Sequence, residues 1–266
     1  SGSDYSGFLQ HLGIACFNVS FGGHGRGGEY HTAFDTFDHY TRFIDPDFAY
    51  GAALTDVCGR LTLRLANAEI LPFDFETAAA EIRRYVDEIV KLAETKRTEI
   101  ETYNEAIEKD YFRLANDPAK PFIAPEAKEP VPHFNFAPLQ NAVDRLDASV
   151  TRFDALRGEF VKGNIALTAT QLAELNKLMY QSERAFLNPD GLPRRPWFRH
   201  SIYAPGFYTG YGVKTLPGVR EGIEEEGYDE AQEQVHVAAA AIERLAETVD
   251  AASGLLRGNK TGGDNS

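Results

Sequence analysis

Residues 81–114 read EIRRYVDEIVKLAETKRTEIETYNEAIEKDYFRL, and this stretch decides the fold of the chain. Its apolar residues recur at helical spacing among many Glu, Lys and Arg residues, a pattern typical of one face of a long amphipathic helix. These apolar residues are Ile82, Tyr85, Val86, Ile89, Leu92, Ile100, Tyr103, Ile107, Tyr111 and Leu114. We therefore expect one long helix, straight or bent, from Glu76 onward.

Similar apolar stripes follow along the chain. Residues 118–138 hold six prolines and predict an irregular crossover, because continuous helix is impossible there. A stripe from Leu139 to Phe160 resumes the helical pattern, Thr168 with Gln171 forms a capping-box pair that opens the next helix, and a last helix is expected from Asp229 to Ala252. The pattern predicts a four-helix arrangement with one long crossover and one long loop.

The first seventy or so residues have a different character. A short helix with Tyr5 and Leu12 on its apolar face is expected to end at Gly13, and Ile14–Val19 reads as a buried strand. A second helix is expected after Asp45-Pro46-Asp47, with Leu54, Val57, Cys58, Leu61 and Leu65 on one face. One strand cannot make a sheet domain, so this part is interpreted as the tail end of an α/β domain whose body lies upstream of Ser1.

The predicted domains are residues 1–71, the end of an α/β domain, and residues 72–256, a helical domain. Residues 257–266 have little to bury and are expected to be disordered. The overall prediction is a mainly α chain.

The composition excludes some classes of function. The formal net charge of −13 argues against binding to nucleic acid or to an anionic membrane surface, because both need clustered Lys and Arg. No apolar run is long enough to span a bilayer. Cys16 and Cys58 lie in apolar surroundings without a CxxC pairing and are interpreted as small buried residues rather than as a disulfide or metal site.

A histidine follows a glycine-rich run in FGGHGRGGEYHTAF, residues 21–34. Glycines let the backbone approach an ion closely, so His31 is a candidate metal ligand. An ordinary surface or half-buried histidine is the alternative. The loop from Asn188 to Gly218 is the other informative stretch, with the single Trp, several Tyr and Phe and a local positive cluster. Such a loop either serves the function or only closes one end of the bundle.

Three motifs together resemble the glutamate carboxypeptidase II and transferrin receptor family. They are EYHTAFDTFDHYTRFIDPDFAYG at residues 29–51, LANAEILPFDF at 65–75 and LNPDGLPRRPWFRHSIYAPG at 187–206. The resemblance implies the C-terminal part of that family's chain, namely the end of a zinc-peptidase α/β domain followed by a transferrin receptor-like helical domain that forms a homodimer. It also implies a location outside the cytoplasm.

The resemblance implies a role for several residues. Two zinc ions are expected in the intact protein, with His31 as one ligand and Tyr30 on the substrate side, whereas no catalytic residue is expected within these residues. Gly2, Ser3, Gly210 and Tyr211 match positions that line the substrate. Gly210 stands where the family has a lysine, and Asn18 and Ser20 stand where it has arginines, so selectivity for acidic substrates is in doubt. Lys214 is a possible substitute.

The resulting expectation is a zinc-dependent exopeptidase that hydrolyses peptide bonds with a zinc-activated water. These residues alone are expected to be inactive, because one histidine cannot hold a catalytic zinc pair. Two alternatives stay open: a non-catalytic, receptor-like module for dimerisation and partner binding, and a stand-alone helical interaction protein.

Overall fold

The structure is a computed structural model that describes residues 3–23, 28–210 and 212–257 of the 266-residue chain. It divides into two compact units. Residues 1–15 and 73–266 form one unit, named the helical unit, and residues 16–72 form the other, named the turn unit. The mainly α prediction is confirmed, because the described elements are helices apart from two strands of three residues each.

The division after Pro72 lies next to the predicted domain boundary, whereas residues 1–15 group with the helical unit rather than with residues 16–72. The assignment of residues 1–71 to a peptidase domain stays a prediction. The tail expected to be disordered is residues 257–266; Arg257 is instead the last residue of a helix, and residues 258–266 lie outside the described residues.

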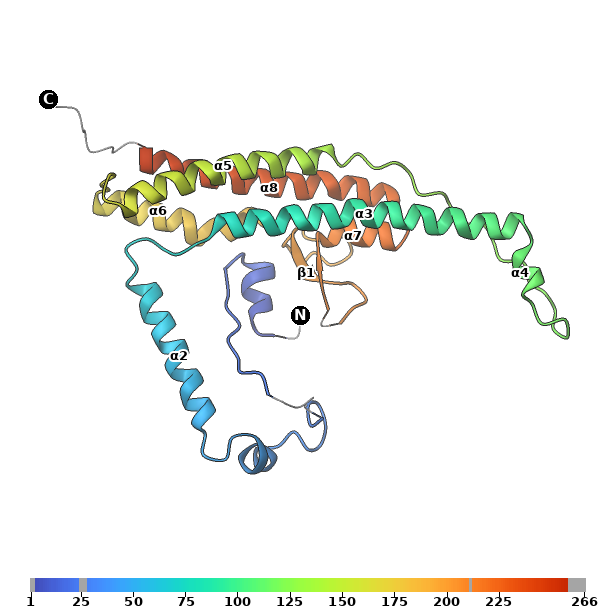
Figure 1. The fold of residues 1–266 in the computed structure, drawn as a ribbon, viewed down its shortest axis with the longest axis horizontal. Coiled ribbons are helices and arrows are strands. Elements are labelled where there is room, and N and C mark those ends of the chain that lie inside the picture. Colours follow the sequence, from blue (N-terminus) through green and yellow to red (C-terminus); the bar gives the residue numbers. More distant parts are fainter. Residues whose placement is uncertain (1–2, 24–27, 211, 258–266) are drawn as a thin grey trace. The chain divides into compact units, whose positions relative to one another are not determined.

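Four long helices build the helical unit (Figure 1). They are α3 (Phe75–Glu108), α5 (Ala137–Val161), α6 (Ala169–Gln181) and α8 (Tyr228–Arg257). A 3₁₀ helix, η3 (Ser182–Phe186), extends α6, and a short helix, α7 (Pro217–Glu224), precedes α8. The four-helix prediction is therefore confirmed, and α7 is an additional element that the sequence pattern did not reveal.

The pair α5 and α8 forms the most extensive helix contact in the unit. Arg145 pairs with Glu243 and Arg152 with Asp250, and both pairs span the same 98 residues of sequence. Because the register advances by seven residues on each helix, the two helices run parallel. The predicted apolar stripes meet beneath these pairs, with Leu146, Val150, Phe153, Ile242, Leu245 and Val249 buried. This contact is the core of the unit.

Helix α3 runs antiparallel to α5. Asp74 caps its first turn by accepting a hydrogen bond from the Thr77 amide, at 3.0 Å. Phe75 at this end packs edge-to-face on Phe153 with 5.4 Å between ring centroids, and Arg83 further along binds Asp144 of α5 at 2.7 Å. The helix is thus fixed at its start by a cap and then by contacts to α5.

The long helix ends earlier than predicted. Asp110 has a left-handed backbone (φ 55°), which stops α3 at Glu108 and starts a separate turn of helix, α4 (Tyr111–Leu114). The proline-rich crossover then returns along α3, with the Asn104 side chain donating to the Lys128 carbonyl at 2.8 Å (Figure 1). The irregular crossover predicted for residues 118–138 is confirmed up to Phe136, whereas Ala137 and Pro138 already belong to α5.

The predicted strand Ile14–Val19 is wrong. This segment is irregular, and among the described residues no strand pairs with it, so its backbone has no ladder to join. The prediction that both cysteines are buried is also wrong. Cys16 is exposed, and Cys58 is half-buried. The short helix before Gly13 is present as a π-helical turn, η1 (Gly7–His11), which buries Gln10 rather than its apolar residues.

The turn unit contains three helical segments. They are α1 (Phe37–His39), η2 (Tyr40–Ile44) and α2 (Ala49–Ala66). The Asp45 carboxylate accepts hydrogen bonds from the amides of Tyr50 and Gly51, at 3.1 and 2.9 Å. The expected helix start, with proline at the first helical position, is wrong, because α2 starts only after Phe48, whose backbone is left-handed. The Asp45 side chain nevertheless binds amides of the first turn. Leu54, Cys58, Leu61 and Leu65 share the half-buried face of α2, whereas Val57 is exposed.

Candidate functional site

The turn Glu29–Thr32 holds the candidate metal ligand. The Thr32 amide donates to the Glu29 carbonyl at 3.0 Å, and the Thr32 hydroxyl donates to the same carbonyl at 2.6 Å. His31 is the third residue of this β-turn and has a left-handed backbone (φ 59°). Turns with a left-handed third residue prefer Gly or Asn there, so a histidine costs about 1 kcal/mol or more.

The turn presents Tyr30 and His31 side by side. Their rings stack with 3.9 Å between centroids, and both side chains are exposed, Tyr30 by 63%. Left-handed non-glycine residues cluster at functional sites, where the surrounding structure compensates for the strain. The turn therefore has the geometry expected of a displayed imidazole with an aromatic neighbour.

The described residues do not form a zinc site by themselves. A protein zinc site needs three or four ligands, and among residues 3–23, 28–210 and 212–257 no three His, Cys, Asp or Glu side chains are grouped to hold a metal. The turn supplies one nitrogen donor, that of His31. His24, in the same glycine-rich run, lies outside the described residues.

The remaining predicted site residues belong to the helical unit. Ser3 is exposed, and its carbonyl accepts hydrogen bonds from the Ser6 amide and hydroxyl, at 3.1 and 2.7 Å. Gly210 has a left-handed backbone (φ 57°), which suits glycine. Gly2 and Tyr211 lie outside the described residues. Tyr30 and His31 belong to the turn unit.

Gly210 lies in a hairpin within the long loop. Strands β1 (Tyr203–Pro205) and β2 (Val213–Thr215) pair antiparallel, with Tyr203 opposite Thr215. The prediction of a loop without regular structure is therefore wrong for this part. Each of the two strands has only three residues, which is too few to show an alternating apolar pattern in the sequence.

The rest of the loop is fastened to its surroundings. His200 is buried, and its Nδ1 accepts a hydrogen bond from the Tyr203 amide at 3.0 Å while Nε2 lies 2.9 Å from the Glu183 carboxylate. Because Nδ1 accepts, the proton is on Nε2, which donates to Glu183. Gly191 allows the chain to pass Pro196, whose carbonyl oxygen would lie 2.2 Å from an added Cβ.

The segment that carries Ser3 docks on this loop. The Gln10 carbonyl accepts hydrogen bonds from the Arg199 and His200 amides, at 2.8 and 3.2 Å. His11 stacks on Trp197 with 4.9 Å between ring centroids. Tyr5 interacts with Tyr203 at the start of β1, and burial together with that tyrosine raises the pKa of Tyr5. The structure thus joins two segments that resemble substrate-lining regions.

The positive charge proposed to replace the missing lysine is already neutralised. Lys214 on β2 forms an ion pair with Glu224 of α7. Arg195, in the same loop, pairs with Glu221 of α7 in a buried position. The loop motif was recognised in the sequence, but neither partner was, because nothing in the sequence indicated that residues 217–224 form a helix facing the hairpin.

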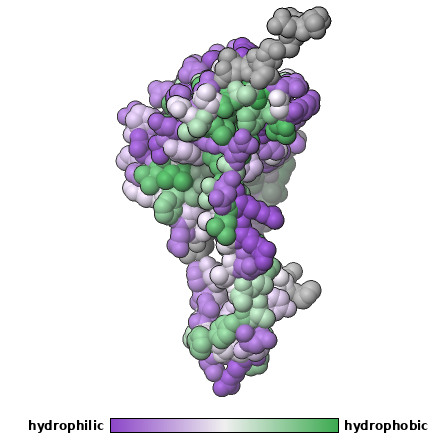
Figure 2. All heavy atoms as spheres, turned by 90° about the vertical axis from the view of Figure 1, so that its left-hand side faces the viewer, coloured by the Kyte–Doolittle hydropathy of each residue, from purple (hydrophilic) through white to green (hydrophobic). Residues whose placement is uncertain are grey.

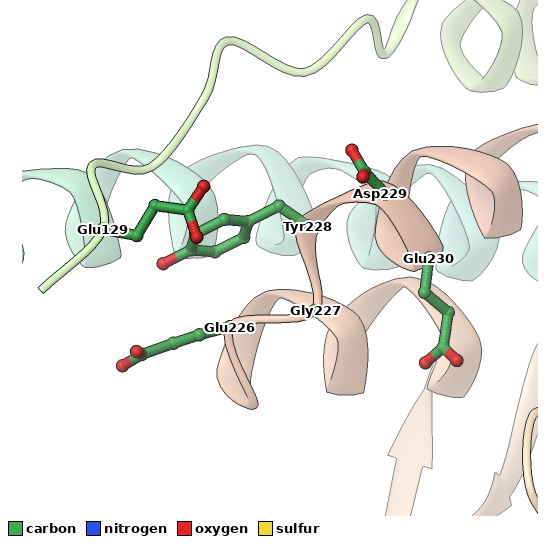
Figure 3. A pocket seen from close by; sticks show the side chains of 6 residues that line it. All are labelled: Glu129, Glu226, Gly227, Tyr228, Asp229 and Glu230. Carbon is green, nitrogen blue, oxygen red and sulfur yellow. The ribbon is translucent and has the colours of Figure 1, made fainter.

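An acidic hollow lies where α7 passes into α8. Its volume is about 230 Å³, and Figure 3 shows the side chains around it, namely Glu129, Glu226, Tyr228, Asp229 and Glu230 beside Gly227. Lys96 and Lys128 bind Glu226, and Arg194 binds Glu230. Two of the four carboxylates therefore serve ion pairs, and the hollow does not resemble a catalytic site.

The surface mixes hydrophobic and hydrophilic side chains on the face drawn in Figure 2. Among the described residues, no helix has the length and apolar character needed to cross a membrane.

Comparisons with known proteins relate both units to one family. A model described as the transferrin receptor-like dimerisation domain matches residues 134–250. A probable glutamate carboxypeptidase of Arabidopsis thaliana is 30% identical over 224 residues, which cover 84% of this chain and 26% of that protein. The aminopeptidase NAALADL1 of Rattus norvegicus is 24% identical over 264 residues, covering 94% of this chain and 30% of the relative. The chain thus spans between a quarter and a third of the length of these relatives.

Proposed function

Because this chain belongs to the glutamate carboxypeptidase and transferrin receptor family, we propose that it works as part of a zinc-dependent exopeptidase. The relatives named carboxypeptidase and aminopeptidase support a peptidase-type enzyme. The reaction we propose is hydrolysis of a peptide bond, for which bound zinc would supply an activated water.

The observation that carries this proposal is the left-handed backbone of His31. His31 is one of six non-glycine residues with a positive φ among the described residues, and such strained positions often lie at functional sites. In our proposal His31 provides one metal ligand, and the other ligands and the general base come from outside this chain. The chain on its own is then inactive.

Tyr30 has the second role in the turn. Its ring stacks on His31, and its exposed face is available to a substrate. We assign Tyr30 to the substrate side of the metal site. In the helical unit, taken by itself, we propose that Ser3 and the hairpin that carries Gly210 contact the substrate. Gly210 supplies no charge at its position and Lys214 is paired with Glu224, so these residues offer little attraction to an acidic side chain.

The metal role is tested by His31→Asn in the full-length protein. Asn tolerates the left-handed backbone and preserves the turn, so the variant removes the imidazole with little strain. We expect bound zinc per chain, measured by mass spectrometry of the metal, to fall together with peptidase rate. His39→Asn, in the same unit, is the control and should leave both unchanged. Unchanged zinc in His31→Asn would refute the ligand role.

The helical unit is proposed to form a homodimer, because the matched model is that of a dimerisation domain. Light scattering of the chain should give twice its 29.5 kDa mass. A monomer at high concentration would contradict this part of the proposal.

A receptor-like, non-catalytic module is the second candidate. It is favoured by the match of residues 134–250 to a dimerisation domain. Hydrolysis of unblocked dipeptides by the zinc-loaded, full-length protein decides between the two. Dimers that bind zinc poorly and hydrolyse no peptide would favour the second candidate.

A further inference from the structure

Arg195 and Glu221 form a buried ion pair between the long loop and α7. Arg195 Nη2 lies 2.5 Å from Glu221 Oε2, and the side chains are only 9% and 3% exposed. Other Arg–carboxylate pairs of the described residues are more open to water, for example Arg152 with Asp250 at 43% and 37%. Burial lowers the pKa of Arg195, and the Glu221 charge opposes that shift.

The same two side chains also hold the backbone that leaves β1. The Arg195 guanidinium donates to the Pro205 carbonyl, and Glu221 Oε1 accepts a hydrogen bond from the Phe207 amide at 2.7 Å. Between these two anchors, the Gly206 amide donates to the Gly212 carbonyl at 3.0 Å and closes the hairpin tip, residues 206–210 and 212. The ion pair therefore fixes the backbone at the point where the chain passes from β1 into the tip.

Helix α7 holds the returning strand as well. Lys214 of β2 pairs with Glu224, one helical turn after Glu221, and Arg220 binds the Thr215 carbonyl and hydroxyl at 3.1 and 2.9 Å. Both strands are thus tied to one helix. Beyond these ties the tip exposes Phe207 by 38% and Tyr208 by 79%.

Stability alone is a poor reason for this arrangement. Two buried charges lose much of their hydration, and apolar residues of similar volume would often stabilise the protein equally well or better. Within the described part of the chain, Arg195 Nε has no hydrogen-bond partner, which adds to the cost. What the pair provides and apolar side chains cannot is directed hydrogen bonding to the Pro205 carbonyl and the Phe207 amide.

We propose that Arg195 and Glu221 are positioning residues that hold the hairpin tip in the conformation in which it contacts a peptide substrate. This inference rests on the proposed function, because a contact between the tip and a peptide substrate is part of that proposal. The clamp itself depends only on the contacts described above, so the two parts can be tested separately.

The clamp is tested by hydrogen exchange of the full-length protein, followed by mass spectrometry. In Arg195→Met, amides in peptides covering residues 203–215 should exchange about tenfold faster or more, while α5 and α8 are unchanged. Arg195→Lys should also fail to protect them, because one ammonium cannot reproduce the guanidinium fork. Glu221→Gln keeps an acceptor for Phe207 and should show a smaller acceleration. Arg97→Met is the control, since Arg97 also donates to two carbonyls but far along the crossover.

Unchanged exchange of residues 203–215 in Arg195→Lys and Glu221→Gln would overturn the clamp, and these mild variants carry the test if Arg195→Met does not fold. The substrate part is tested by kinetics: KM should rise about tenfold in Arg195→Lys with kcat and bound zinc little changed. Faster exchange with unchanged KM would overturn that part. Absence of peptidase activity in the unmodified protein would instead refute the proposed function, and exchange would still decide the clamp.

Discussion

Helices α8 and α2 have comparable apolar stripes but differ in what covers them. Helix α8 is buried along its length against α5, α6 and α7, whereas no residue of α2 is buried among the residues that the structure describes. A stripe of apolar residues thus predicts which face of a helix will be covered, but burial requires a partner element. The helical unit contains the helices that cover the stripe of α8. Substitutions of its buried residues should therefore lower its free energy of unfolding, whereas substitutions in α2 should have little effect.

The largest expected effect compares one substitution in the two helical regions. Leu146→Ala in α5 removes a fully buried side chain and should lower the free energy of unfolding by about 2–5 kcal/mol. Leu63→Ala in α2, where the side chain is 63% exposed, should change it by less than about 0.5 kcal/mol. Urea unfolding followed by circular dichroism measures both. Equal losses would show that α2 is covered by something other than the described residues.

A smaller effect is expected at the start of α6. Thr168 and Gln171 form the predicted capping box, so Thr168→Ala should cost about 1 kcal/mol of the free energy of unfolding. Thr170→Ala, in the first turn of the same helix, lacks that cap and should cost clearly less. The same unfolding measurement compares them, and equal costs would mean that the cap contributes little.

The turn unit should respond in the opposite direction at His31. His31→Gly removes the cost of a left-handed histidine and should slow exchange of the Thr32 amide, which donates to Glu29, by up to about fivefold, or roughly 1 kcal/mol. His31→Val should accelerate it, because a β-branched side chain tolerates this backbone poorly. Nuclear magnetic resonance resolves this single amide. Slower exchange in His31→Val than in His31→Gly would contradict the claim that the left-handed backbone is strained in the original protein.

The smallest effect concerns pH and the cap of α3. Hydrogen bonds from the Thr77 amide and hydroxyl lower the pKa of Asp74 below its ordinary value of 3.8. The stabilisation is therefore complete above the ordinary value and is lost as the pH falls through the lower pKa of the folded state. Asp74→Asn should be slightly less stable than the original protein near pH 6, and the difference should shrink towards pH 3. If the difference in stability between Asp74→Asn and the original protein grows on acidification, the Asp74 carboxylate does not stabilise the start of α3.

The sequence predicted those helices that are marked by a local pattern of residues. The stripes of α5 and α8 and the capping box of α6 are local patterns, and local patterns with buried partners were confirmed. The break at Asp110 was missed, because an aspartate in a left-handed conformation leaves no mark in the apolar spacing. The strand Ile14–Val19 was predicted from composition, yet a strand exists only when a neighbouring strand completes its hydrogen bonds.

The candidate site was predictable in place but not in geometry. The motif singled out Tyr30 and His31, whereas the turn that they occupy and its left-handed backbone appear only in the structure. The long loop was recognised as informative, but the link between Arg195 and Glu221 joins residues 26 positions apart through a helix that was not predicted. Specific pairing of buried charges is a tertiary property, and spacing alone does not encode it.

The parallel pairing of α5 and α8 has a consequence for how the chain folds. The ion pairs along the contact of α5 with α8 join residues 98 positions apart, so forming this contact requires a large loss of chain entropy. During synthesis, α3 and α5 can form their antiparallel pair early, but α5 keeps an uncovered apolar face until α8 has left the ribosome. We therefore expect slow, late closure of the core and a transient need for protection from aggregation while the hairpin and α7 are being made.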